Sequence, residues 1–156
     1  MVLKQYYFIL NDIMKEIGSR STCPVGYTLD VFGDKWTLLL LRDMIFSDKN
    51  SWLEWRASDE HIAPSVLSDR VGLLLDENYL IKKVSESNAS KFLYYLTDKG
   101  LDLIPMMVEL MEFGCKYSPK GGSAYWMKKI EASKKKTIQE LHEKMLAART
   151  EAFPAT

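Results

Sequence analysis

The stretch of sequence that decides the fold is Ile62–Gly100, which is IAPSVLSDRVGLLLDENYLIKKVSESNASKFLYYLTDKG. Its first part, Ala63–Glu77, predicts a helix. Pro64 suits a first helical turn, where its missing N–H is not needed, and apolar residues then recur at three- and four-residue steps. The predicted inner face consists of Val66 or Leu67, Val71, Leu74 and Leu75. Four residues are expected to face solvent: Ser65, Ser68, Asp69 and Gly72.

Two β-like runs follow this helix, Leu80–Val84 and Phe92–Leu96, and the polar sequence SESNASK between them is long enough for a hairpin loop. Thr97–Asp98 then begins another helix. This order predicts a winged helix-turn-helix, in which the second helix of the motif can enter a DNA major groove and the hairpin is the wing. The expected fold class is therefore mainly α with a small β-hairpin (α+β).

The region before this stretch predicts four helices, beginning with an amphipathic one over Val2–Ile17. Val25–Phe32 is expected to be a short helix, and Asp34 is expected to cap the strongly apolar helix that follows it. Leu38–Leu41 is apolar on all sides, which predicts a central place in the core for that helix. Trp52–Ser58 is the fourth, with three candidate packing residues: Trp52, Leu53 and Trp55.

After the hairpin, the sequence predicts two long helices separated by a linker. The first runs from Thr97 to about Tyr117, and Pro105 inside it predicts a kink. Ser118–Ser123, with its Pro and two Gly residues, is the best candidate linker. The last helix is expected over Ala124–Ala148.

The composition is that of an ordinary globular protein, with 47% hydrophobic and 27% charged residues in a chain of 156. No apolar run is long enough to span a bilayer. Cys23 and Cys115 lie far apart, without metal-ligand spacing to each other or to the two histidines. We therefore expect a cytoplasmic protein without a structural metal or a cofactor. No Ser/His/Asp or Cys/His set and no Gly-rich phosphate loop is visible, so we do not expect an enzyme.

The charge balance gives no support to strong DNA binding. Lys and Arg number 21, as do Asp and Glu, and the 61–100 segment has five basic and five acidic residues. Each neutralised phosphate adds to affinity through counterion release, so we expect modest affinity and dependence on dimer avidity. The 124–150 segment has seven basic residues against three glutamates. It could contact phosphates or a partner, but a solvated helix face is the favoured interpretation.

The run CPVGYTLDVFGDKWTLLLLRDMIF, Cys23–Phe46, resembles the opening of HxlR-type transcriptional regulators, winged-helix proteins related to the MarR type. In that family a Cys-Pro leads into a short helix, and then a Gly, a polar residue, a basic residue and Trp-Thr precede an apolar helix. Here these are Cys23, Pro24, Gly33, Asp34, Lys35, Trp36 and Thr37. The sequence EWRASDEHIAPSVLSDR is similar to the second helix, turn and recognition helix, and Tyr94–Gly114 to the second wing strand and the long helix after it. The resemblance covers roughly Cys23–Tyr117.

The resemblance implies a homodimer that binds double-stranded DNA at a two-fold operator, with terminal helices forming much of the dimer contact. We accordingly expect residues 1–118 to form a winged-helix domain including an N-terminal dimerisation helix. Residues 119–156 would be a C-terminal helical extension of that domain. Two features depart from the family: no basic residue stands near Ser65, and the tail after Ser118 is longer or more divergent. The neutral 61–100 segment keeps a second hypothesis open, a winged-helix protein-interaction module without DNA binding.

The candidate DNA contacts in the recognition helix are Pro64, Ser65, Ser68, Asp69 and Arg70. Ser65 and Ser68 lie at its start, where side chains reach base edges or phosphates. Asp69 could accept from a cytosine amino group, or hold Arg70 in place, which is the role we favour. Arg70 resembles a well-kept arginine of the family. It could reach a phosphate or pair with a carboxylate such as Asp43.

Four lysines outside that helix are further candidates. Lys82, Lys83 and Lys91 flank the wing, where they suit phosphate or minor-groove contact, although a solvated hairpin is common. Lys35 could touch a phosphate with help from the free N–H groups of its helix. Cys23 matches the N-terminal family cysteine, which some relatives use to sense oxidants or electrophilic aldehydes. A small-molecule or redox effector is therefore an open partner, with an inert cysteine as the favoured alternative.

Overall fold

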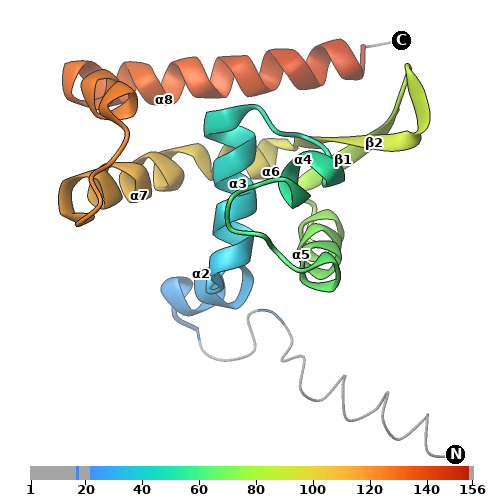
Figure 1. The fold of residues 1–156 in the computed structure, drawn as a ribbon, viewed down its shortest axis with the longest axis horizontal. Coiled ribbons are helices and arrows are strands. Elements are labelled where there is room, and N and C mark those ends of the chain that lie inside the picture. Colours follow the sequence, from blue (N-terminus) through green and yellow to red (C-terminus); the bar gives the residue numbers. More distant parts are fainter. Residues whose placement is uncertain (1–16, 18–21, 155–156) are drawn as a thin grey trace, which may run out of the picture.

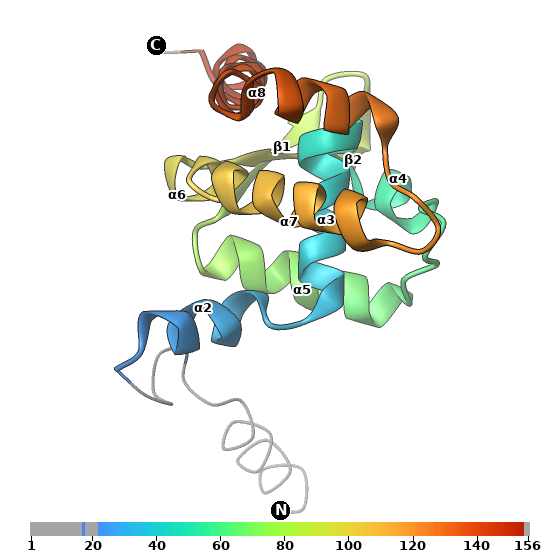
Figure 2. The same cartoon turned by 90° about the vertical axis from the view of Figure 1, so that its left-hand side faces the viewer.

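The computed structural model describes residue 17 and residues 22–154, so the predicted helix Val2–Ile17 lies, except for its last residue, outside the described part (Figures 1 and 2). Its elements are α2 (Pro24–Phe32), α3 (Lys35–Ser47), α4 (Trp52–Arg56), α5 (Pro64–Asp76), β1 (Leu80–Ser85), β2 (Asn88–Leu96), α6 (Asp98–Leu101), α7 (Ile104–Tyr117) and α8 (Ala124–Ala152). The predicted fold class, mainly α with a β-hairpin, is confirmed. No helix among these residues is long and apolar enough to cross a bilayer.

Helix α3 stands in the middle of the molecule, between α2 and α5 on one side and α7 and α8 on the other (Figures 1 and 2). Asp34 caps it as predicted, since its carboxylate accepts from the N–H groups of Trp36 at 2.9 Å and Thr37 at 3.1 Å. Within the predicted all-apolar turn, Leu40 and Leu41 are buried, whereas the two leucines before them remain half-exposed. The core position of this helix is therefore confirmed, with one side of it less covered than expected.

Helices α4 and α5 form the helix-turn-helix. Leu67, Val71 and Leu74 are buried, so Leu67 takes the inner position that the sequence left open between two residues. Trp55 of α4 is 2% exposed and packs in the core as predicted. The prediction for Leu53 is wrong, because this side chain is 70% exposed. Trp52 and Trp55, three residues apart, share the face of α4 that packs on the core, and Leu53 lies outside that face.

The wing is an antiparallel hairpin in which Leu80 pairs with Leu96 and Val84 pairs with Phe92. The register then shifts, and Ser85 pairs with Asn88. The predicted seven-residue loop SESNASK is therefore wrong: most of it belongs to the strands, and only Glu86 and Ser87 form the tip. The loop before α4 adds to the hairpin, because the Tyr94 N–H donates to the Asn50 carbonyl at 2.8 Å.

The predicted kinked helix from Thr97 to Tyr117 is two helices, with a break at residues 102–103 between α6 and α7. Thr97 caps α6 by accepting from the Gly100 N–H at 3.0 Å. Pro105 lies in the first turn of α7 rather than at a kink inside a helix. This position suits proline, because a first-turn N–H needs no helical acceptor.

Helix α8 ends four residues later than predicted and crosses the end of the domain opposite α2 (Figures 1 and 2). It bends sharply at Ser133, whose φ of −169° and ψ of 101° are not helical. The Ser133 hydroxyl accepts from the Lys136 N–H at 3.3 Å, as a cap for the second half. Ile130 and Leu141, one in each half, are buried. The bend thus lets both halves cover the core.

Candidate nucleic-acid interface

The N-terminal turn of α5 is exposed and has no side-chain cap. Ala63 occupies the cap position without a capping hydrogen bond, and Pro64 follows it in the first turn. The backbone N–H groups of Ser65 and Val66 therefore have no helical acceptor. Such N–H groups, at the positive end of a helix dipole, suit a phosphate. Ser65 is exposed beside them, as predicted.

Ser68 and Asp69 are also exposed, on the next turn of α5. The Trp52 indole N–H of α4 donates to the Ser68 hydroxyl at 3.4 Å. Arg56 lies over the Trp52 ring at 5.6 Å and donates to the Ile62 carbonyl. The sequence analysis did not single out Arg56, because no periodicity or motif brings it next to α5. Its guanidinium is nevertheless a partly exposed cation beside the start of the recognition helix.

Arg70 ties α5 to the start of α3. Its Nη1 lies 3.5 Å from Oδ2 of Asp34, the same carboxylate that caps α3. The internal carboxylate is thus Asp34, and not Asp43 or Asp69 as the sequence suggested. Asp43 binds other groups, and the role of holding Arg70 that was favoured for Asp69 belongs to Asp34. The Arg70–Asp34 pair is partly exposed, with 36% of the Arg70 side chain and 29% of the Asp34 side chain accessible.

Lys35 is exposed and lies 4.7 Å over the ring of Trp36. Two of the N–H groups at this helix start, those of Trp36 and Thr37, donate to Asp34, so fewer remain for an anion than the sequence suggested. The Thr37 hydroxyl also donates to Asp34, at 2.6 Å. Any anion at Lys35 would therefore meet the ammonium group together with a capped helix end.

The three wing lysines have different surroundings. Lys82 is exposed and lies 4.9 Å over the Phe92 ring, and none of the ion pairs found among residues 22–154 includes it. Lys83 pairs with Glu86 at 3.0 Å, and Lys91 approaches Glu54 of α4 at 3.8 Å. Both of these pairs are exposed enough to exchange for a phosphate at little cost. Lys82 is the wing cation most available to an outside anion.

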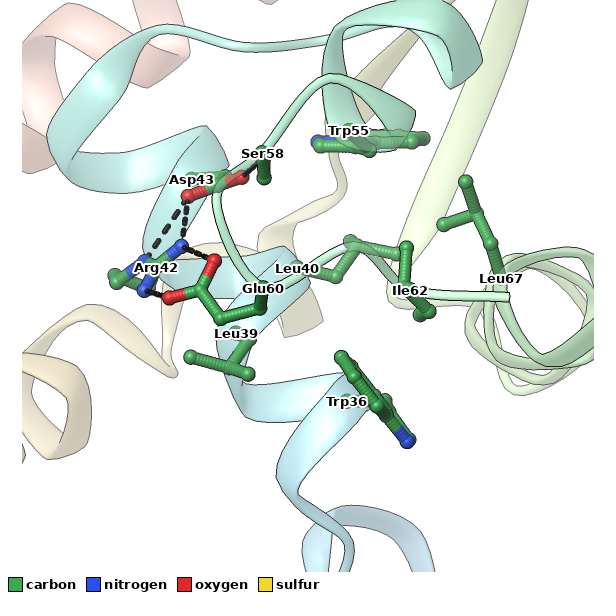
Figure 3. A pocket seen from close by; sticks show the side chains of 10 residues that line it. All are labelled: Trp36, Leu39, Leu40, Arg42, Asp43, Trp55, Ser58, Glu60, Ile62 and Leu67. Atoms are coloured by element: carbon green, nitrogen blue, oxygen red, sulfur yellow. Dashed lines mark hydrogen bonds and ion pairs between the residues drawn. The ribbon is translucent and has the colours of Figure 1, made fainter. Parts of the chain in front are cut away.

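A buried carboxylate holds the turn between α4 and α5 against α3. Asp43 is 3% exposed and accepts from Arg42 Nη2 at 2.6 Å, from Lys49 Nζ at 3.2 Å, and from the Ser58 hydroxyl. Two guanidinium nitrogens of Arg42 also donate to the carboxylate of Glu60 (Figure 3). Four of these side chains, Arg42, Asp43, Ser58 and Glu60, border a cavity of about 20 Å³, which has room for about one water molecule. The network fixes the segment that leads into the recognition helix.

Acidic pH is expected to weaken the pair between Arg42 and Glu60. The hydrogen bonds from Arg42 lower the pKa of Glu60 from 4.5 to about 2. The stability that this carboxylate contributes is therefore complete above pH 4.5 and is lost as the pH falls from 4.5 toward 2. Because solvent screens the exposed pair, we expect a contribution of about 1 kcal/mol. Melting curves across this range should show a smaller acid loss for Glu60→Gln than for the wild type. Equal losses would contradict the assignment.

The two cysteines lie in different environments. Cys23 is exposed and directly precedes α2, the helix-start position that the sequence suggested. Its sensing role stays a prediction. Cys115 is half-buried on α7, with its sulfur 3.9 Å from that of Met111. In the part of the chain described, no three His, Cys, Asp or Glu side chains are grouped as a metal site would require.

Most of the basic residues of α8 pair with carboxylates of the same chain. Five of the seven take part in ion pairs: Lys129, Lys134, Lys136, Lys144 and Arg149. Their partners lie on α7, on α8 itself, after α3 and on α6. This neutralisation favours the solvated helix face over a phosphate-binding tail.

Comparison with known proteins supports the same architecture. A family model described as HxlR-like helix-turn-helix matches residues 31–121. An uncharacterized HTH-type transcriptional regulator of Mycobacterium tuberculosis is 31% identical over 96 residues, which are 62% of this chain and 60% of that relative. YdeP of Bacillus subtilis, also an HTH-type transcriptional regulator by name, is 29% identical over 113 residues, 72% of this chain and 83% of YdeP.

Among solved structures, PA1607, described as a candidate transcription factor, is similar with a TM-score of 0.58 and 32% identity over 67% of this chain and 73% of that one. The matched part spans about 60% of the length of the mycobacterial relative. The family model, in contrast, covers more than half of this chain, from the end of α2 through the wing to the linker before α8. The chain belongs to the HxlR-like helix-turn-helix family.

Proposed function

We propose that this chain is a transcriptional regulator that binds double-stranded DNA as a homodimer, with α5 in the major groove. The observation that carries the proposal is the uncapped, exposed N-terminal turn of α5 with Ser65 and Ser68 beside it. A recognition helix presents this end to base edges in helix-turn-helix proteins. In such a regulator, which works on DNA in the cytoplasm, the wing would contact the flanking backbone or minor groove.

The contacts fall into two groups. Ser65, Ser68 and Asp69 would face base edges, where hydroxyls can donate or accept and a carboxylate can accept from a cytosine amino group. The N–H groups at the start of α5 would meet a phosphate, and Pro64 would pack close to the DNA backbone there. The remaining phosphate contacts would come from four lysines: Lys35, Lys82, Lys83 and Lys91. Arg70 would act from within, through Asp34, by setting the angle of α5.

The neutral surface makes the homodimer important. A single subunit offers few phosphate contacts, so binding energy from two half-sites would be combined through avidity. The half-sites of a two-fold dimer of this kind lie about 34–36 Å apart, one turn of B-DNA. A two-fold operator is the expected target.

Selection from a pool of random duplexes, at a low and a higher salt concentration, tests the proposal. We expect enrichment of a palindromic motif and binding that weakens as salt rises. Lys82→Gln should make the slope of log affinity against log salt shallower by about 0.9 for each subunit. Lys135→Gln, an exposed lysine of α8 far along the chain from the wing, is the matched control and should leave the slope unchanged.

Absence of enrichment at both salt concentrations, from reduced and from oxidised protein, would overturn the proposal. A winged-helix module that works through protein contacts would then be the better hypothesis. Enrichment with equal slopes for the wild type and Lys82→Gln would keep DNA binding and remove Lys82 from the interface.

A further inference from the structure

Helix α8 begins at Ala124, after the end of the family match at residue 121. It is the longest helix in the described part of the chain, and its second half runs toward the wing (Figure 1). The helix that follows the family match therefore lies against the element that would contact DNA. Its contacts with the wing are specific side-chain contacts.

Arg149, near the end of α8, binds the exit of the wing. Its Nη1 donates to the carbonyl of Leu96, the last residue of β2, at 3.1 Å. Its Nη2 donates to the carboxylate of Asp98, the first residue of α6, at 2.6 Å. The Arg149 side chain is 18% exposed, whereas the carboxylate of Asp98 that it binds is 91% exposed. One side chain thus fixes the backbone where β2 leaves the hairpin.

Two further contacts support the wing along its length. The ring of Phe153 meets the ring of Tyr95 edge to face, with centroids 5.6 Å apart. Tyr95 is a residue of β2 and pairs with Ile81 of β1, so Phe153 supports both strands by its contact with β2. Lys144 binds Asp48, in the loop that reaches β2 through the bridge from Ser51. A two-stranded hairpin is marginally stable alone, so such support matters to its position.

The other end of α8 is anchored to α7. Lys134 lies 2.9 Å from Glu109 and 2.5 Å from Glu112. This anchor directly follows the bend at Ser133, and the rest of α8 runs from it toward the wing (Figure 1). Ile130 is buried on the near side of the bend, which keeps the start of α8 on the core. The helix is therefore held at one end by α7 and holds the wing with the other.

We propose that α8 is an intramolecular strap that sets the position of the wing relative to α5. Arg149 and Phe153 are then positioning residues for the contact between the wing and DNA, and this last step rests on the proposed function. Three basic residues of α8 pair with carboxylates elsewhere in the chain: Arg149, Lys144 and Lys134.

The test is the double variant Arg149→Gln/Phe153→Ala in the full chain. Hydrogen exchange of the wing amides, residues 82–95, is measured on the free protein, and duplex affinity is measured on the operator found by selection. We expect exchange in the wing to be about tenfold faster, because a charge-assisted hydrogen bond and an aromatic contact are lost. Affinity should fall about tenfold. Arg149 lies in the last turn of α8 and Phe153 directly follows the helix, so the variant is expected to fold, and Phe153→Ala alone is the milder version.

Lys136→Gln is the control. It also removes one positive charge from α8, but Lys136 is 75% exposed and pairs only within α8, with Glu140. Loss of affinity through general electrostatics would appear equally in this control, whereas loss of the strap would not. Arg149→Lys keeps the charge with one donor group in place of the guanidinium fork, so it should fall between the wild type and the double variant.

Each outcome decides a separate point. Unchanged exchange in the wing of the double variant overturns the strap. Faster exchange with unchanged affinity overturns its role in DNA binding. A wild-type protein that binds no duplex counts against the proposed function, and the exchange measurement then decides the strap alone.

Discussion

Replacing Asp43 by asparagine is expected to lower the free energy of unfolding by about 3 kcal/mol. The Asp43 carboxylate is 3% exposed and binds Arg42, Lys49 and Ser58 at once. The amide has the same shape but no charge, so Lys49 loses its carboxylate partner and Arg42 keeps only its pair with Glu60. Removal of one member of a buried pair costs about 3–5 kcal/mol. The lower end applies here because the Arg42 and Lys49 side chains are each 31% exposed and keep part of their hydration.

Urea unfolding followed by circular dichroism measures this effect, and the melting temperature should fall by roughly 10 °C. Asp59→Asn is the matched control, because Asp59 is an exposed carboxylate in the turn beside the same network. Its stability should differ from the wild type by less than about 0.5 kcal/mol. A loss below about 1 kcal/mol for Asp43→Asn would mean that the network does not hold the turn to α3.

Ser65→Glu is expected to reduce duplex affinity at least about 30-fold while leaving the protein as stable as the wild type, or slightly more stable. A carboxylate at position 65 would lie beside the phosphate that the N–H groups of this helix start would meet, and like charges brought together at an interface cost several kcal/mol. About 2 kcal/mol corresponds to the 30-fold loss. In the free protein the same carboxylate lies at the positive end of the α5 dipole, where it is favourable.

Ser65→Glu is informative because its duplex affinity is expected to fall while its stability is expected to stay the same or rise. Equilibrium binding to the selected operator and thermal melting are measured on the same preparations, with Ser65→Gln as the uncharged control of similar size. The control should bind within a few-fold of the wild type. Equal affinity of Ser65→Glu and Ser65→Gln would place the start of α5 away from the DNA. A fall in stability along with affinity would point to a folding defect instead.

The helices that position the candidate interface follow from local patterns. Asp34 before an apolar run predicts the capped helix α3, and Pro64 before a periodic run predicts α5 within one residue at each end. Capping and periodicity act between residues a few positions apart, so the sequence displays them directly. The family resemblance rests on the same local segments in the right order.

The partners of the charged residues could not be predicted in this way. The sequence offers several carboxylates as partners for Arg70, and only the packing of α5 on α3 selects Asp34. The extent of the wing strands was also missed, because SESNASK is polar throughout and pairing across the hairpin, not hydrophobicity, makes most of it strand. The prediction that Leu53 packs in the core was wrong because α4, a helix of five residues, buries only one face, and Leu53 lies on the other.

The sequence by itself determined the order of elements, the capped core helix, the recognition helix with its serine-lined face, and the family. Only the tertiary structure decided that Asp43 anchors the turn before α5, that Asp34 holds Arg70, and that Arg149 of α8 holds the wing. The last of these pairs joins residues 51 positions apart. Long-range pairs of this kind depend on how whole helices pack, because ion pairing has no periodicity along the chain and is set by distances of a few ångströms in space.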